Sequence, residues 1–249
     1  MGANVAVVRF PGTNCEFDVA EAVTALGGEP TIVFHDEVSL GSADSVVIAG
    51  GFAHGDYLRP GAIARFSPIM EAVSRFALDG GAVIGICNGF QVLCESHLLP
   101  GALQKNAGLR FKCGTARLRV ESNRSALTEQ CAVGDELNVP INHFEGNYTC
   151  SEETLAELRD NDRIVLRYVE NPNGSVDDIA GICNEGRNVV GLMPHPERAC
   201  NPLLGSSDGI PLMRSLLRAC SLRPEASGAG DAGRAQYRRV PRPHARLPR

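Results

Sequence analysis

One cysteine in this chain stands where a catalytic nucleophile would be expected. Residues 82–91 read Ala-Val-Ile-Gly-Ile-Cys-Asn-Gly-Phe-Gln, a short apolar run that leads into Gly-x-Cys-x-Gly. The apolar half is typical of a strand buried on both faces of a parallel sheet. A nucleophile between two glycines, where such a strand turns into a helix, is typical of a nucleophile elbow. Cys87 would then lie at a helix N-terminus, where the helix dipole favours a thiolate.

The same position also suits oxyanion binding. The backbone amide of Asn88 would be among the first of the helix, so it would be free to donate to a developing negative charge. The structural alternative is a buried cysteine in a tight turn, because free cysteines often serve only as small core residues. The pattern by itself favours the functional interpretation over the structural one.

A second motif, Pro194-His195-Pro196-Glu197, follows an apolar run at residues 188–193. Pro196 disfavours a helical conformation of His195, and in an extended segment alternate side chains point to the same side. His195 and Glu197 are therefore predicted to pair, with the carboxylate orienting the imidazole. An ordinary surface histidine beside a glutamate would explain this motif better if it stood alone. Together with the elbow, it predicts a triad of Cys87, His195 and Glu197.

Alternating strands and helices must position these motifs. Strands are predicted at residues 4–10, 31–35, 45–49 and 82–86. Helices are predicted to begin at the capping box Thr13-x-x-Glu16 and at Ser67-Pro68. The expected inward-facing side chains are Phe17, Ala20 and Val23 in the first helix, and Ile69, Val73 and Phe76 in the second. This alternation predicts an α/β fold with a doubly wound, mainly parallel sheet flanked by helices. Ligands bind at the carboxyl ends of such strands, where both motifs fall.

The pattern changes after Ser96. Further strands are expected at residues 109–113, 116–121, 136–141 and 164–169, and a hairpin is expected from residues 179–183 and 188–193. We predict that these strands form antiparallel additions at the far side of the sheet. Helices are predicted at residues 151–160 and 210–220.

The chain is predicted to divide into one domain, residues 1–222, and an Arg/Pro-rich tail, residues 223–249, without fixed structure. The tail holds seven arginines but only two acidic residues, whereas the whole chain of 249 residues has a net charge of −5. A body this acidic does not suggest a nucleic-acid-binding protein.

Several protein classes are disfavoured by composition. No apolar stretch approaches the length of a membrane span, and the N-terminus shows no signal-peptide pattern. The nine cysteines include no Cys-x-x-Cys pair, so neither a disulfide framework nor a metal site is predicted. These features predict a cytoplasmic protein that binds neither membrane nor nucleic acid. The absence of a Gly-x-x-x-x-Gly-Lys-[Ser/Thr] loop argues against an ATP site in this chain.

Residues 85–91 together with His195-Pro196-Glu197 resemble class I (triad) glutamine amidotransferases. More specifically, the chain resembles the glutaminase subunits of phosphoribosylformylglycinamidine synthases over about residues 4–222. The segments that carry this second resemblance are residues 10–15, 50–59, 61–66, 143–147, 173–176, 178–181 and 193–198.

The resemblance implies glutamine hydrolysis. Cys87 would attack the side-chain amide while His195, oriented by Glu197, moves the proton. The amide of Asn88, with that of Gly51 or Phe52, would stabilise the oxyanion. The residues implied in substrate binding are Gly51, Phe52, Asn88, Gln91, His143, Phe144 and Glu145.

Other interpretations of individual residues remain open. Gln91 could be a polar residue in the first turn of a helix, and His143 could be an ordinary loop histidine. His54 and Asp56 suit docking or loop closure better than chemistry. The other eight cysteines are predicted to be inert packing or surface residues.

The resemblance also implies partners. A large synthetase subunit would use ATP, with magnesium, to convert formylglycinamide ribonucleotide and the released ammonia to formylglycinamidine ribonucleotide. A small subunit would bridge the two, and this chain would need no cofactor of its own. Two alternatives remain at this stage: a stand-alone hydrolase of another γ-glutamyl amide, and a non-enzymatic, DJ-1-like module in which Cys87 senses oxidation.

Overall fold

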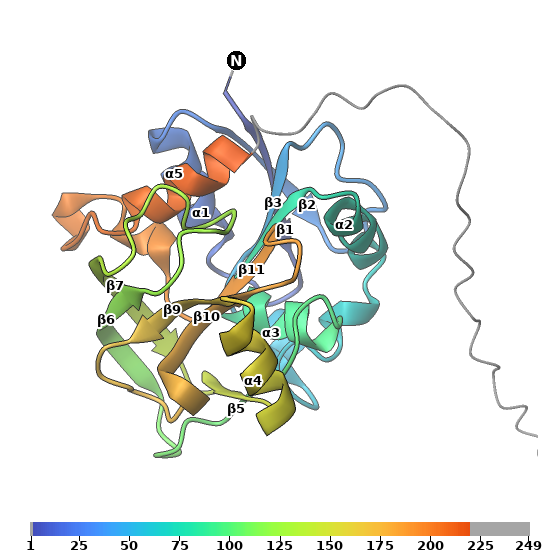
Figure 1. The fold of residues 1–249 in the computed structure, drawn as a ribbon. Helices are drawn as coiled ribbons and strands as arrows, with labels where there is room; N and C mark the ends of the chain where they lie inside the picture. The colour runs from blue at the N-terminus through green and yellow to red at the C-terminus, as the bar shows by residue number, and fades with distance from the viewer. Residues whose placement is uncertain (1, 220–249) are drawn as a thin grey trace, which may run out of the picture.

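The computed structural model describes residues 2–219, and a sheet of nine strands forms the centre of this part of the chain (Figure 1). In spatial order the strands are β2 (Glu29–Phe34), β1 (Asn4–Arg9), β3 (Ser45–Ile48), β4 (Ala82–Ile86), β11 (Val189–Leu192), β10 (Ile179–Cys183), β9 (Ile164–Tyr168), β6 (Lys112–Val120) and β7 (Glu136–His143). The first five are parallel to one another, and from β11 onward each neighbour is antiparallel. The predicted tail and Cys220 lie outside the described residues.

Helices cover both faces of the parallel half. They are α1 (Glu16–Ala25), α2 (Ile69–Leu78), α3 (Asn88–Glu95) and α5 (Ile210–Ala219). Helix α4 (Glu152–Asp160) instead precedes β9 in the antiparallel half. Helices α1 and α5 contact each other on one side of the sheet, and α2 and α3 lie on the other side (Figure 1). Strands β5 (Ala102–Gln104) and β8 (Asn147–Thr149) form a separate two-stranded ladder. The prediction of a doubly wound sheet with antiparallel additions is confirmed.

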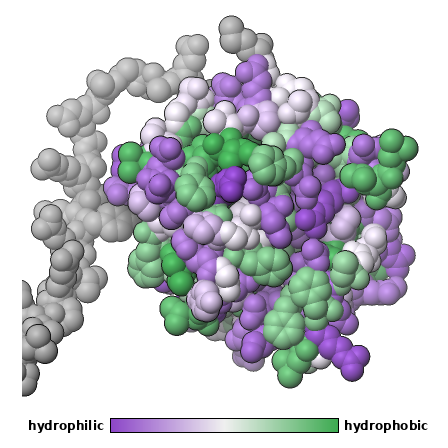
Figure 2. Space-filling model, turned by 180° about the vertical axis from the view of Figure 1, so that it is seen from behind, coloured by the Kyte–Doolittle hydropathy of each residue, from purple (hydrophilic) through white to green (hydrophobic). Residues whose placement is uncertain are grey.

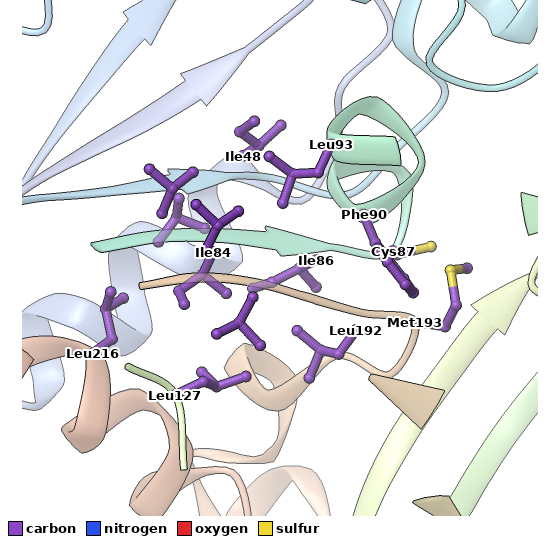
Figure 3. Packing of buried hydrophobic residues seen from close by; sticks show 14 of the residues in the cluster. Ile48, Ile84, Ile86, Cys87, Phe90, Leu93, Leu127, Leu192, Met193 and Leu216 are labelled. Atoms are coloured by element: carbon purple, nitrogen blue, oxygen red, sulfur yellow. The ribbon is translucent and has the colours of Figure 1, made fainter. Parts of the chain in front are cut away.

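Every residue of β4 is buried. Gly85 faces Gly89 and Leu93 of α3, so Ile84 and Ile86 point to the opposite face of the sheet. Cys87 stands at the end of the strand (Figure 3). Continuous burial explains why the strand reads as an unbroken apolar run. None of the helices within residues 2–219 is both long and apolar enough for a membrane crossing.

The prediction for the first helix was wrong in two respects. The side chain of Thr13 does not cap the helix; its hydroxyl accepts from the Phe10 amide at 2.9 Å, and Cys15 is the N-cap residue. Phe17 is 62% exposed, whereas Val23 is buried as predicted and Val19 and Ala22 complete the buried face. The inward face therefore follows a different helical stripe from the predicted one, because the helix begins later and in another orientation.

The antiparallel strands also differ from the prediction. Residues 109–113 do not form a separate strand, because Leu109 has a φ of 48° and the strand begins at Lys112. β6 instead runs unbroken to Val120, paired with β7 on one side and β9 on the other. Gly114 pairs with Ile141 of β7, and this pairing outweighs its weak strand preference. Helix α2 begins at Ile69, slightly after the expected Ser67-Pro68 start.

Gly89 is where the helix after the elbow touches the sheet. A Cβ added at Gly89 would lie 2.0 Å from the carbonyl oxygen of Ile48, which is backbone and cannot rotate away. We expect Gly89→Ala to lower the free energy of unfolding by roughly 2–3 kcal/mol and the melting temperature by roughly 5–10 °C. Gly108→Ala is the control, because nothing lies within 4 Å of its Cβ position. Equal melting temperatures for the two variants would contradict this account of the elbow.

Candidate active site

Cys87 occupies the predicted elbow between β4 and α3. Its backbone has φ 51° and ψ −106°, a conformation that an L-residue adopts only when its surroundings enforce it. The Cys87 amide donates to the Leu192 carbonyl at 2.8 Å, which ties the turn to the neighbouring strand. In Figure 3 the sulfur points away from the packed aliphatic side chains. The strained turn thus directs the thiol toward the carboxyl edge of the sheet.

His195 follows β11 at the same edge. Its Nδ1 lies 2.7 Å from Oε1 of Glu197, and both side chains are almost completely buried. The pairing is confirmed, but the predicted extended backbone was wrong. Pro196 begins a 3-10 turn, η4 (Pro196–Ala199), and the pair closes across that turn. Proline suits the first position of such a turn because its φ is already fixed near the helical value.

Gly50 is where the nucleophile and the histidine meet. A Cβ placed on Gly50 would lie 2.9 Å from Cε1 of His195 and 3.4 Å from Cβ of Cys87. The side chains of Cys87 and His195 therefore both lie next to Gly50, at the carboxyl end of β3. The sulfur of Cys87 is also 3.8 Å from the carbonyl oxygen of Asn142, so β7 forms another wall of the site.

Electrostatics favour a protonated His195. Burial opposes charge on the ring, but the Glu197 carboxylate and the sulfurs of Cys87 and Cys15 more than offset it and raise the pKa of His195 well above its usual value. Nε2 nevertheless has no hydrogen-bond partner among the described residues, so the sulfurs act through proximity and not through a well-aligned bond. A ring that is held by a carboxylate and faces a thiol can carry the proton between two steps of a reaction.

The predicted oxyanion donors come from two segments next to Cys87. Asn88 is the first residue of α3, and Gly51 and Phe52 follow β3. The Phe52 amide donates to the Gly12 carbonyl at 2.9 Å, so it is already engaged. The Gly51 amide is therefore the better candidate partner for the Asn88 amide.

The Asn88 side chain holds the adjoining loop. Its Oδ1 accepts from the Ala53 amide at 2.9 Å, and its Nδ2 donates to Asp56 at 3.2 Å and to Gln91 at 2.7 Å. Gln91 in turn donates to the Glu145 carbonyl at 2.5 Å. Burial and the nearby Glu145 raise the pKa of Asp56 to about 6. This network joins the loop after β3, the first turn of α3 and the loop after β7.

His143 ends β7 as a buried residue and not as an ordinary loop histidine. Its Nδ1 lies 3.2 Å from Oδ1 of Asn106, and that oxygen also accepts from the Gly146 amide at 3.1 Å. Burial, followed by the nearby charge of His195, lowers the pKa of His143 to about 4. The ring is therefore neutral near pH 7. Asn106 also holds the backbone of Phe144, because the Phe144 carbonyl accepts a hydrogen bond from the Asn106 amide at 2.8 Å.

Two residues at the site were not found by sequence reasoning. Asn106 was not singled out, because a lone asparagine in a loop carries no periodic signal. Cys15 was expected to be inert, yet its sulfur lies beside the His195 ring and accepts from Arg198 at 3.1 Å. The segment around Cys15 was recognised, but only its tertiary position shows what the thiol contacts.

Comparisons with known proteins agree with this site. A family model for the CobB/CobQ-like glutamine amidotransferase domain matches residues 2–208. The phosphoribosylformylglycinamidine synthase subunit PurQ of Rubrobacter xylanophilus is 57% identical, over 86% of this chain and 97% of that protein. The subunit of the same name from Helicobacter hepaticus is 54% identical, over 88% of this chain and 100% of that protein. A chain in the structure of PurLQS from Thermotoga maritima has a TM-score of 0.82 and 40% identity, with 88% of this chain and 99% of that chain covered.

The low pKa of His143 makes stability depend on pH. Between pH 6.5 and about 4 the unfolded chain binds a proton at this residue and the folded chain does not, so stability falls as the pH falls through this range. His143→Gln should remove this contribution, which amounts to about 3 kcal/mol at most. Urea unfolding at several pH values from 7 to 4.5 would measure it. The exposed His97→Gln is the control, and an unchanged slope in His143→Gln would disprove the assignment.

Proposed function

The chain belongs to the glutamine amidotransferase family, among the PurQ subunits of phosphoribosylformylglycinamidine synthase, and from this premise we propose how its site works. The chain is a glutaminase that hydrolyses glutamine to glutamate and ammonia for purine biosynthesis. The observation that carries the proposed mechanism is the buried His195–Glu197 pair at 2.7 Å, beside a cysteine held at a strained elbow.

The first half of the reaction forms a thioester. With the proton of Cys87 already held by His195, the thiolate attacks the carbonyl carbon of the glutamine side chain. The oxygen becomes negatively charged as the tetrahedral intermediate forms, and we assign its stabilisation to the amides of Asn88 and Gly51. The carbon–nitrogen bond then breaks as His195 donates its proton to the departing ammonia.

The second half restores the thiol. His195, now neutral, takes a proton from water, and the resulting hydroxide attacks the thioester carbon. The carbon–sulfur bond breaks, glutamate leaves, and the proton on His195 returns to Cys87. Glu197 keeps its charge throughout and stabilises the imidazolium each time it forms. Every proton taken in one step is returned in the next.

The released ammonia has to be used before water protonates it, which calls for a partner enzyme and a shielded path. We propose a synthetase subunit that uses ATP with magnesium, together with a small bridging subunit, all in the cytoplasm. The relative from Thermotoga maritima belongs to a structure named PurLQS, which supports such an assembly. The loop after β3 also carries Tyr57, Leu58 and Phe66, which are all highly exposed. Hydrophobic side chains reach the surface in several groups on the face shown in Figure 2.

The triad can be tested by substitution. We expect Cys87→Ser and His195→Ala to lower glutaminase kcat/KM at least about 1000-fold, and Glu197→Gln roughly 100-fold. Glu197→Gln should have the smaller effect, because it removes the charge but keeps a group that can orient the ring. His97→Ala, at an exposed position, should leave the rate unchanged. A fully active His195→Ala would remove the triad mechanism, and a redox-sensing role for Cys87 would then need testing.

Partner dependence separates this function from that of a stand-alone hydrolase. Cys87 and His195 are only 6% and 1% exposed, so the isolated chain presents little of either residue at its surface. We expect the isolated chain to hydrolyse glutamine slowly, and the complete complex with its ribonucleotide substrate and ATP to raise kcat at least about tenfold by opening the site. Equal turnover in both preparations would favour the stand-alone hydrolase.

A further inference from the structure

The thiol of Cys15 lies beside the ring of His195, and the proposed mechanism makes no use of it. One potential ligand atom each from Cys15, His195 and Glu197 lies within 4.8 Å of the other two. All three side chains are buried. Sulfur, imidazole nitrogen and carboxylate oxygen are the three kinds of atom by which proteins bind zinc.

The backbone explains why these side chains meet. Cys15 precedes α1, and its amide donates to the Gly50 carbonyl at 3.2 Å. A Cβ on Gly50 would lie 3.3 Å from the Cys15 sulfur and 2.9 Å from Cε1 of His195. The missing side chain of Gly50 therefore leaves room for the thiol to approach the ring. The cluster is built into the fold by β3, the start of α1 and the turn after β11.

Two atoms in the cluster lack partners. Nε2 of His195 and Oε2 of Glu197 are buried and make no hydrogen bond to any described residue. Buried polar atoms are nearly always satisfied. The glutaminase cycle accounts for Nε2, which exchanges a proton with Cys87 and the leaving group. The cycle does not account for Oε2 of Glu197, so this oxygen is available to bind a ligand.

We propose that Cys15, His195 and Glu197 form an inhibitory site for a divalent cation of the zinc class. The Cys15 thiolate and the Glu197 carboxylate would balance the two positive charges. The guanidinium of Arg198 donates to the Cys15 sulfur at 3.1 Å and is itself paired with Asp18 at 2.8 Å, so a cation bound at this sulfur would displace the contact with Arg198. Binding releases the thiol proton and the proton carried by the ring.

Occupation of this site would stop catalysis for a simple reason. A metal bound to His195 takes the electron pair that would accept the Cys87 proton, so the nucleophile cannot be activated. Glu197 would also be drawn from its role as the orienting carboxylate. Inhibition in this form rests on the proposed glutaminase function, whereas metal binding by the cluster does not.

Cobalt can report the site directly, because a thiolate bound to Co²⁺ absorbs in the near ultraviolet by charge transfer. The full-length chain is titrated with Co²⁺ under reducing conditions, as wild type and as Cys15→Ser, Cys87→Ser and Cys113→Ser variants. We expect one saturating absorption change in the wild type, its loss in Cys15→Ser and its retention in Cys87→Ser. Cys113→Ser is the matched control, because Cys113 is an exposed free thiol of β6 and is not one of the three residues of the cluster.

Zinc inhibition is measured on the complete complex, with each variant compared with its own metal-free rate. Cys15→Ser should raise the zinc concentration needed for half-inhibition at least about tenfold, and Cys113→Ser should not change it. Retained cobalt absorption and zinc sensitivity in Cys15→Ser would overturn the proposal, as would loss of the absorption in Cys87→Ser. If a complex proved to lack glutaminase activity altogether, the absorption titration would still decide whether the metal site exists.

Should Cys15→Ser fail to fold, as judged by circular dichroism, the wild type alone can settle the question. Anomalous diffraction from crystals soaked in Co²⁺ would locate the ion. Density within bonding distance of the Cys15 sulfur and the His195 ring supports the site. Density at Cys87 without Cys15, or only at surface carboxylates, contradicts it.

Discussion

The close approach of α3 to the sheet is the constraint on which the rest of this structure depends. Cys87 can adopt its strained conformation only because Gly89 lets the helix backbone come against Ile48. The completely buried strand β4 anchors the turn from one side, and the bond from the Cys87 amide to Leu192 anchors it from the other. Packing of the core therefore holds Cys87 in its strained conformation. That conformation in turn sets the direction of the thiol.

The same edge of the sheet concentrates ionisable groups in buried positions. His195 and Glu197 would be costly to bury separately, because an unpaired charge in the interior is strongly destabilising. Their pairing removes much of that cost and gives the ring a fixed orientation. His143 lies close by but stays neutral, since burial and the charge of His195 both oppose its protonation. One histidine is thus prepared to carry a proton while its neighbour is not.

Local sequence predicted much of this arrangement. The strand–Gly-x-Cys-x-Gly–helix pattern located Cys87, and the spacing of two residues placed His195 against Glu197. The stated reason for that pairing was wrong, because Pro196 starts a 3-10 turn and does not extend the chain. The error had no consequence, since both backbone shapes allow the two side chains to meet. The prediction of the buried face of α1 was also partly wrong. The orientation of this helix is set by packing against β2 and α5, which the local sequence does not show.

Contacts between distant segments could not be read from the sequence. Asn106 supports His143 from a loop that precedes it by more than thirty residues, and Cys15 reaches His195 from the other end of the chain. Neither residue lies in a periodic pattern, because each acts through one side chain in an irregular segment. Such contacts depend on which loops the sheet order brings together, and that order is itself a property of the whole fold.

The loop after β3 is bonded to the first turn of the helix that follows the elbow. His54, Asp56 and Leu58 all have positive φ, which costs free energy for residues other than glycine. The loop is held by the bonds from the Asn88 side chain to Ala53 and Asp56. A partner that contacted the exposed side chains of this loop could release those bonds at little net cost, because relief of the backbone strain would offset part of their loss. Opening and activation would then be one event, since Asn88 also begins the helix that carries the oxyanion donor.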